Sequence, residues 1–524
     1  MVKYSINLRQ VLSLTLIAAL VMTIVFIPKA NITGYTQGLQ NFTQIENQER
    51  EILRPVSIEV DGERVWFLWD QPAVIVDGRT LAPALQMFKP LGFEVEGDDA
   101  TGQILIKNED YEIILHIGSA EFTTNGVRHE LDVPAQIIND NIMIPVRALM
   151  VSMGYYVSWH GRESLVLVSS TPITYVTIAG EQFSSALRSL TLGRDLNDEE
   201  LVSLGELTNL TSLTLGGSEY GDFTPLSNLI NLRSLTLWAT GTSDIKFLAT
   251  LYNLTDLSFW GNYISDLTPL AGLTNLRFLD LGANEVEDLT PLAELRNVTM
   301  LHLAGNAISD LTPLSNMTSL SHLNLNNNQV ADLTPLAGLT SLLRLELRDN
   351  KVTDVTPLAE LPNLEELDLR SNEISDLTSF ANLVNVLEIN LQFNQIRDVA
   401  PLAGLENLRF LDLSNNAISD LAPLANLVEL RHLELNGNEI SDLAPLANMT
   451  GLWNLFLNMN EISDLEPLAD LTNLQWLFLR SNQITDLTPL SNLYNLSLLD
   501  VGGFPNQIND WTPVEHVEEV VGRP

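Results

Sequence analysis

Residues 273–295 read LTNLRFLDLGANEVEDLTPLAEL, and this stretch decides the fold because close copies of it recur along much of the chain. In each copy an Asn follows the leucine-rich half, and the next copy places its Asn 22 residues later. These asparagines are Asn262, Asn284, Asn306, Asn328, Asn350, Asn372, Asn394, Asn416, Asn438, Asn460 and Asn482. Ser218 and Thr240 hold the two earlier positions, and Asn506 comes after a two-residue insertion. A fixed period of this length predicts a solenoid of stacked repeats.

The alternation of residues within each copy predicts where the side chains lie. Side chains alternate between the two faces of a strand, so the leucines of LxL point inward and their neighbours outward. The Asn turns inward at the end of the strand, where its amide satisfies buried backbone groups of neighbouring coils. A ladder of 14 aspartates, from Asp222 to Asp510, follows four residues later. We expect these aspartates to close turns, since one carboxylate per repeat lacks the clustered ligands that calcium needs.

This pattern resembles leucine-rich repeats, and most closely the short repeats of the internalin type. The resemblance implies an α/β leucine-rich repeat solenoid with a curved parallel β-sheet over residues 206–511. Residues 171–205 are predicted to form its N-terminal cap, with a capping box of Asn197 and Glu200. Residues 512–524 are predicted to form a C-terminal cap helix, because four valines share one helical face. They are Val514, Val517, Val520 and Val521.

A duplicated segment precedes the repeats. The stretch that begins at Pro72 aligns with the stretch that begins at Pro134 at a constant offset of 62, which also pairs Gly92 with Gly154. Each copy predicts a strand, a helix that starts at a proline and ends at a glycine, and further strands. Residues 55–170 are therefore expected to form a small α+β domain with two related halves.

The motifs VDGRTLAP, IIND..MIPVRAL and MGYYVSW make this domain similar to the copper amine oxidase N-terminal-like domain. In the first half Glu96-Gly97-Asp98 stands where that family has a Trp-Asp pair. The resemblance implies a stalk-like appendage without the copper site or the quinone of amine oxidases. His116, His129 and His160 lie far apart and lack metal-ligand spacing. We therefore predict no bound metal and no cofactor.

The N-terminus carries an export signal. Lys3 and Arg9 precede the uncharged run 11–27, VLSLTLIAALVMTIVFI. Residues 1–30 are predicted to be a signal peptide or, if uncleaved, a membrane anchor, and the polar residues 31–54 a spacer. The rest of the chain is then expected in the cell envelope or outside the cell.

Composition excludes several classes of function. Lys and Arg number 27 against 66 Asp and Glu, a formal net charge of −39. A surface this acidic repels phosphate backbones and anionic headgroups, so we expect neither nucleic-acid binding nor a polybasic membrane contact. The absence of cysteine excludes disulfides, thiolate metal sites and Cys nucleophiles. No GxxxxGK[ST], HExxH or GxSxG motif occurs, and we predict no enzymatic activity.

The outward strand positions identify three zones of the predicted concave face. Trp238, Trp260 and Tyr263 lie near the start with Phe278, charged residues from Arg344 to Arg370 alternate in the middle, and Phe456, Trp476 and Phe478 lie near the end. Phe456 and Phe478 hold one position in adjacent repeats, about 5 Å apart across the sheet. Exposed contiguous aromatics favour a partner surface over a stripe that only stiffens the sheet.

These observations predict an exported, non-enzymatic recognition protein that uses its repeat face for protein–protein interaction or adhesion at the bacterial cell surface. The alternative is a structural module that binds cell-wall glycan through its aromatic surfaces.

Overall fold

The computed structural model describes residues 55–68, 71–98, 100–161, 164–217 and 221–523. The candidate export signal, the spacer and Ser218 lie outside these residues. Within the described residues, no helix is both long and apolar enough to cross a membrane.

The domain before the repeats is built from short strands and two short helices. Its elements are β1 (Ser57–Val60), β2 (Glu63–Val65), β3 (Val74–Val76), β4 (Arg79–Pro83), α2 (Ala84–Phe88), η1 (Lys89–Leu91), β5 (Glu94–Asp98), β6 (Gln103–Lys107), β7 (Glu112–His116), β8 (Glu121–Thr124), β9 (Val127–Glu130), β10 (Gln136–Ile138), β11 (Asn141–Pro145), α3 (Val146–Ser152), β12 (Tyr156–His160) and β13 (Leu165–Ser169). They form sheets of order β12-β13-β1-β2, β10-β11-β4-β3 and β5-β6-β7-β8-β9.

The predicted duplication is visible element by element. At the offset of 62, β3, β4, β5 and β6 correspond to β10, β11, β12 and β13, and α2 and α3 start at equivalent residues. The halves meet where β4 pairs with β11, and there the equivalent residues Ala82 and Ile144 are direct partners. The two copies are thus related by a local twofold axis through this pair. The first half has Glu96-Gly97-Asp98 in place of the Trp-Asp pair of the family. This change leaves the fold intact, because β5 continues to Asp98.

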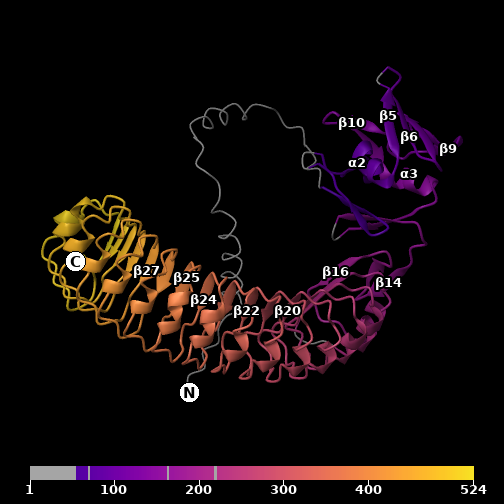
Figure 1. Cartoon of the computed structure of the whole chain (residues 1–524). Helices are drawn as coiled ribbons and strands as arrows, with labels where there is room; N and C mark the ends of the chain where they lie inside the picture. The colour runs from indigo at the N-terminus through magenta and orange to yellow at the C-terminus, as the bar shows by residue number, and fades with distance from the viewer. Residues whose placement is uncertain (1–54, 69–70, 99, 162–163, 218–220, 524) are drawn as a thin grey trace. The chain divides into compact units, whose positions relative to one another are not determined.

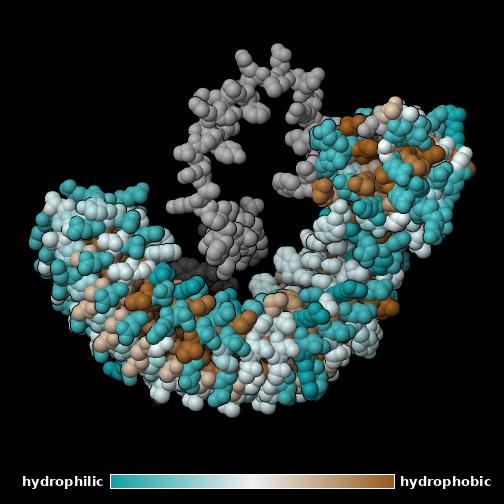
Figure 2. Space-filling view, turned by 45° about the horizontal axis from the view of Figure 1, so that its top comes forward, coloured by the Kyte–Doolittle hydropathy of each residue, from teal (hydrophilic) through white to brown (hydrophobic). Residues whose placement is uncertain are grey.

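Hydrophobic residues of this domain remain accessible. Figure 2 shows hydrophobic side chains gathered on its visible surface. Its exposed large apolar residues include Trp66, Val127, Ile137, Val151 and Trp159.

A linking segment connects this domain to the solenoid. It contains the hairpin β14 (Tyr175–Ile178) and β15 (Glu181–Ser184), and the helix α4 (Asp198–Leu204) follows the first solenoid strand at Ser189–Leu192. The predicted capping box is present: Glu200 N–H donates to the Asn197 side chain, and Asn197 N–H donates to the Glu200 carboxylate. Leu201 and Leu204 on α4 are buried in the same hydrophobic cluster as the repeat leucines, so the helix covers the first coils.

The solenoid contains one parallel sheet of 16 strands. They are β16 (Ser189–Leu192), β17 (Ser212–Gly216), β18 (Ser234–Trp238), β19 (Asp256–Ser258), β20 (Phe278–Asp280), β21 (Met300–His302), β22 (His322–Asn324), β23 (Arg344–Glu346), β24 (Glu366–Asp368), β25 (Glu388–Asn390), β26 (Phe410–Asp412), β27 (His432–Glu434), β28 (Asn454–Phe456), β29 (Trp476–Phe478), β30 (Leu498–Asp500) and β31 (Glu519–Val521). The strands line the concave side of the arc, and short 3₁₀ turns line the convex side (Figure 1).

In most coils the short 3₁₀ turns begin at the residue before the proline of a TPL-type motif. They are η2 (Thr224–Asn228), η3 (Lys246–Thr250), η4 (Thr268–Leu270), η5 (Thr290–Leu292), η6 (Thr312–Leu314), η7 (Thr334–Leu336), η8 (Thr356–Glu360), η9 (Thr378–Asn382), η10 (Ala400–Leu402), η11 (Ala422–Leu424), η12 (Ala444–Leu446), η13 (Glu466–Leu468), η14 (Thr488–Asn492) and η15 (Thr512–Val514). The Asp that precedes each turn accepts a hydrogen bond from the backbone two residues on, as in Asp376 with Thr378 N–H at 2.8 Å. Turn closure by aspartate is therefore confirmed.

Each asparagine of the ladder bridges its own coil and the coil before it. In one rung Val352 N–H donates to Asn372 Oδ1 at 2.9 Å, and Asn372 Nδ2 donates to the carbonyls of Leu347 and Leu369 at 2.9 and 3.0 Å. Asn506 makes the same kinds of bond, so the coil absorbs the two-residue insertion. These bonds satisfy backbone groups that the stacked coils bury.

The ends of the solenoid differ from the prediction. The sheet begins at β16, ahead of the predicted start at residue 206, because Ser189–Leu192 pair in parallel with β17. The predicted cap helix at 512–524 is wrong. The segment forms η15 and then β31, in which Val520 pairs with Leu499. Val514 and Val517 take the positions of leucines in a degenerate last coil, and this coil pattern overrides the helical spacing.

Candidate functional site

The concave face is made by the outward residues that flank a buried leucine or isoleucine in the repeat strands. Leu455 and Leu477 are buried in the core of the solenoid, so the residues on either side of each leucine face outward. The sheet register places Phe456 opposite Phe478 and Asn454 opposite Trp476. The strand parity that the sequence predicts thus puts Phe456, Trp476 and Phe478 on one face.

Phe456 and Phe478 form a stacked pair. Their ring centroids lie 4.6 Å apart, and the ring planes differ by 9°. Both rings are half-buried, whereas Trp476 beside them is 46% exposed. The rings therefore stiffen the sheet and also keep apolar surface open to solvent.

The stack extends further than the sequence prediction. Phe410 stacks on His432 at 4.7 Å and 13°, and His432 lies 5.1 Å from Phe456. We refer to Phe410, His432, Phe456, Trp476 and Phe478 as the concave aromatic cluster. Sequence reasoning missed Phe410 and His432 because they hold the first outward position of their strands, while Phe456 and Phe478 hold the second. The diagonal step between positions is a property of the folded sheet.

Acidic groups border the cluster on the same strands. His432 Nε2 and Glu434 Oε1 share a hydrogen bond of 2.7 Å, and Asn454 Nδ2 lies 3.3 Å from His432 Nδ1. Asp412 is 4% exposed and accepts a hydrogen bond from Ser414 N–H at 2.9 Å. Burial, with a smaller contribution from the nearby Glu434 carboxylate, raises the pKa of Asp412 to about 6. The cluster thus places apolar rings beside a buried carboxyl with a raised pKa.

The predicted aromatic residues near the start of the array do not form a similar stack. Trp238 ends β18, and Trp260 takes the equivalent position after β19; they are 46% and 52% exposed. The Trp238 indole lies over Gly216 of the coil before it, and the Trp260 indole lies over Gly282 of the coil after it. A Cβ atom added to Gly216 would lie 2.2 Å from the Trp238 ring, and one added to Gly282 would lie 2.9 Å from the Trp260 ring. Tyr263 is exposed but follows Asn262 in the turn, so it lies beside the strands and not on them.

The charged residues in the middle of the face pair with one another. Arg344 forms ion pairs of 2.8 Å with both Glu346 and Glu366. Asn324 and Asn326 donate to the other oxygen of the Glu346 carboxylate. This internal pairing leaves the middle zone with less unsatisfied charge than its composition indicates.

The histidines of the first domain stay separate in the fold. His116 lies in β7, His129 in β9, where it stacks on Phe122, and His160 in β12 near Phe183. Among the described residues, no group of three or more His, Asp or Glu side chains could hold a metal ion.

The repeated coil, the single parallel sheet and the inward asparagines define the class of this protein as a leucine-rich repeat solenoid. Family models agree. "Leucine Rich repeats (2 copies)" matches residues 252–294, 296–338, 340–382, 384–426 and 472–516, and "Copper amine oxidase N-terminal domain" matches residues 59–168. No curated protein matches the chain.

The comparison with solved structures identifies the family. An internalin (inlF) from Listeria monocytogenes is 35% identical to this chain and superposes with a TM-score of 0.53. The alignment covers 63% of this chain and 91% of the internalin chain. The chain belongs to the internalin family of leucine-rich repeat proteins. The functional domain of InlJ from Listeria monocytogenes is 22% identical over 65% of this chain and 73% of its own, with a TM-score of 0.55.

The same architecture occurs in a plant receptor. The ectodomain of the Arabidopsis receptor kinase HAESA, solved with a peptide hormone ligand, is 20% identical over 65% of this chain and 64% of its own, with a TM-score of 0.53. At this identity the likeness concerns the fold alone.

Proposed function

We propose that this chain is an exported, non-enzymatic recognition protein that binds a protein partner at the concave aromatic cluster. The observation that carries the proposal is the stacked Phe456–Phe478 pair with the exposed Trp476 beside it on one face. Tryptophan and other aromatic residues are frequent anchors of protein interfaces, because they bury a large area at a low cost in side-chain entropy. The ordered stack lowers that cost further, since the phenylalanine rings are held before a partner arrives.

The fold supports this assignment. Extended concave surfaces are the usual binding sites of repeat proteins, and the HAESA ectodomain was solved with a bound peptide hormone. Domains of the copper amine oxidase N-terminal type are appendages and not catalytic centres. We assign residues 55–170 to such an appendage.

Export is the second part of the proposal, and it is motivated by the basic start and the apolar run 11–27. Protease added to intact protoplasts of expressing cells should digest the repeats, and full protection would refute export. N-terminal sequencing of the mature protein then distinguishes a cleaved signal from a retained anchor.

The alternative is a cell-wall glycan bound on aromatic surfaces, and the observation that favours it lies near the start of the array. Trp238 and Trp260 each leave about half of the side chain exposed beside a glycine. Exposed indoles on a strand surface offer flat faces for sugar rings.

One experiment separates the two assignments. The purified chain is incubated in parallel with a surface protein extract and with purified wall polymer. The Phe456→Ser, Trp476→Ser, Phe478→Ser triple variant and a matched Trp238→Ser, Trp260→Ser double variant are tested beside it. Capture of a protein that the triple variant loses supports the proposal, whereas capture of polymer that only the double variant loses supports the alternative.

A further inference from the structure

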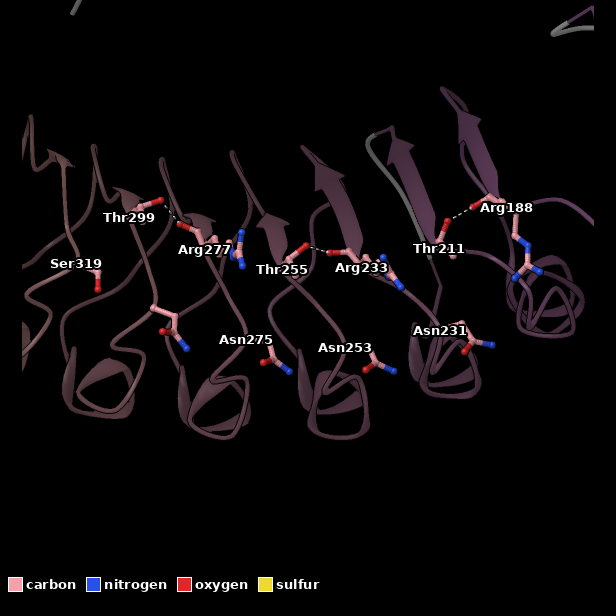
Figure 3. Close-up of a pocket in the computed structure, with 11 residues that line it drawn as sticks. Arg188, Thr211, Asn231, Arg233, Asn253, Thr255, Asn275, Arg277, Thr299 and Ser319 are labelled. Carbon is pink, nitrogen blue, oxygen red and sulfur yellow. Dashed lines mark hydrogen bonds between the residues drawn. The ribbon is translucent and has the colours of Figure 1, made fainter. Parts of the chain in front are cut away.

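A row of cationic and hydroxyl side chains runs along the lateral edge of the early solenoid, where each coil enters its strand. In the order of the coils it consists of Arg188, Thr211, Arg233, Thr255, Arg277 and Thr299. Backbone bonds fix the row in register: Thr255 N–H donates to the Arg233 carbonyl, and Arg277 N–H donates to the Thr255 carbonyl, both at 2.8 Å. Figure 3 shows the alternation of arginine and threonine along the coils.

A second row faces the first across an open groove of about 830 Å³. It consists of Asn231, Asn253, Asn275, Asn297 and Ser319. These asparagines are exposed, and each donates from Nδ2 to a carbonyl of the preceding coil, as Asn253 does to Ile230 at 2.8 Å. Within the described residues their Oδ1 atoms accept no hydrogen bond from protein, so the row offers an acceptor on each of four successive coils.

The arginines of the groove are not neutralised by neighbours. Among the described residues, no carboxylate forms an ion pair with Arg188, Arg233 or Arg277, although acidic residues outnumber basic ones by 66 to 27 in the chain. The carboxylate of Asp256 instead accepts a hydrogen bond from the Thr255 hydroxyl at 2.6 Å. Arg233 and Arg277 are exposed, so their guanidinium groups are available to a ligand.

The spacing and the lining indicate the kind of ligand. Strands of a sheet lie about 4.8 Å apart, so arginines on alternate coils repeat at about 10 Å. Guanidinium groups bind carboxylates and phosphates through paired hydrogen bonds, and the asparagine oxygens accept from hydroxyl groups. All 11 lining residues are polar or charged. The groove therefore offers no apolar pocket for peptide side chains and no aromatic ring on which a nucleic-acid base could stack.

We propose that this groove binds an anionic glycan or polyol polymer, in an extended form that places a negative group beside every second coil. The arginines hold the acidic groups, and the asparagine row holds hydroxyl groups of the units between them. The site lies on the lateral edge, separate from the concave aromatic cluster, so the protein has one surface for a polymer and another for a protein partner.

The test is calorimetric titration of the full chain with polygalacturonate oligomers of defined length at low salt. Maltooligosaccharides of the same length serve as the neutral control. We expect binding of the acidic oligomer alone, weakening as salt is raised. The Arg233→Gln, Arg277→Gln double variant should lose at least about tenfold in affinity, because each variant removes charge-assisted hydrogen bonds. The matched control is Arg296→Gln, since Arg296 lies in the same region but is paired with Glu294.

Further arms identify the anion. Poly(glycerol phosphate) tested beside polygalacturonate distinguishes a preference for phosphate from one for carboxylate, and tighter binding of either polymer supports the proposal. Equal binding of the neutral oligomer, unchanged affinity in the double variant, or tighter binding of poly-L-glutamate would each overturn it, the last in favour of an acidic peptide. Circular dichroism melts of the variants confirm that a loss of affinity is not a loss of fold.

Discussion

The lateral groove near the start of the solenoid and the concave aromatic cluster near its end are built from the same 22-residue coil, yet their chemistry is opposite. The groove is polar and cationic, while the cluster combines stacked rings with a buried carboxyl. Their inward residues make the same bonds: Asn284 and Asn460 each accept from the backbone 20 residues before and donate to the carbonyl 25 residues before. The difference shows that a uniform core leaves each outward position free to specialise.

The largest expected effect is a reciprocal loss of binding. The Phe456→Ser, Trp476→Ser, Phe478→Ser variant should bind a protein partner at least about 100-fold more weakly, because anchors of this type each contribute about 2 kcal/mol or more, although not additively. Its affinity for polygalacturonate should not change. The Arg233→Gln, Arg277→Gln variant should lose affinity for polygalacturonate and keep its affinity for the protein partner. Titrations of both variants with both ligands check this, and a parallel loss of both ligands would show that the two surfaces are one site.

Asp412 provides the next test, since it gives the cluster a pH dependence that the groove lacks. The folded pKa of about 6 lies above the ordinary value of 3.8, so the native state holds its proton more tightly than the unfolded state. The stability linked to this group is present below pH 4 and is lost as the pH rises through about 6. At about 1.4 kcal/mol for each pKa unit, Asp412→Asn should stabilise the chain at pH 7 by up to about 3 kcal/mol.

Denaturant melts of this variant and of the native chain, at pH 4 and pH 7, measure that difference. The control is Asp280→Asn, because Asp280 makes the same turn bond, to Gly282 N–H at 2.9 Å, but is only half-buried. An Asp412 variant that gains no stability at pH 7 relative to pH 4 would contradict the assigned environment.

The common core of the two regions can be tested by comparing two kinds of asparagine. Asn372→Ala should cost about 1–3 kcal/mol, because Asn372 is buried and its loss leaves backbone groups of two neighbouring coils unpaired. Asn473→Ala should cost about 0.5 kcal/mol, because this exposed side chain makes a single bond to the Thr450 carbonyl. Equal shifts of the denaturant midpoint would show that the ladder is not the element that joins the coils.

The smallest effect is expected beside the strands in mid-array. Lys351 and Gln329 are exposed and share one long hydrogen bond of 3.4 Å. Lys351→Ala and Gln329→Ala should each change stability by less than about 0.5 kcal/mol. Neither should affect the binding of a protein partner or of the polymer. A marked loss of partner affinity in either variant would move the interface away from the concave aromatic cluster.

The solenoid was predictable from the sequence because its bonds repeat with the chain. Inward leucines and Asn372 with its equivalents contact the coil directly before or after, and each turn aspartate bonds the backbone two residues on, as Asp376 does. A fixed sequence spacing therefore becomes a fixed position in space. The same logic gave the stack of Phe456 on Phe478. The cap at 512–524 was mispredicted because Val514, Val517 and Val520 satisfy both a helical period and a degenerate coil, and only pairing of Val520 with Leu499 distinguishes the two.

The sequence by itself therefore determined the fold class, the internal duplication and the face on which Phe456, Trp476 and Phe478 lie, because these follow from local periods and strand parity. Only the tertiary structure decided which outward residues act together. His432, at the first outward position of its strand, contacts Phe456, at the second outward position of the next strand. Asp412 gains its raised pKa from burial. Arg233 and Arg277 line one groove without an ion pair in the described part of the chain. These properties depend on burial depth and on neighbours from other coils, and none of them is encoded in the spacing of a single repeat.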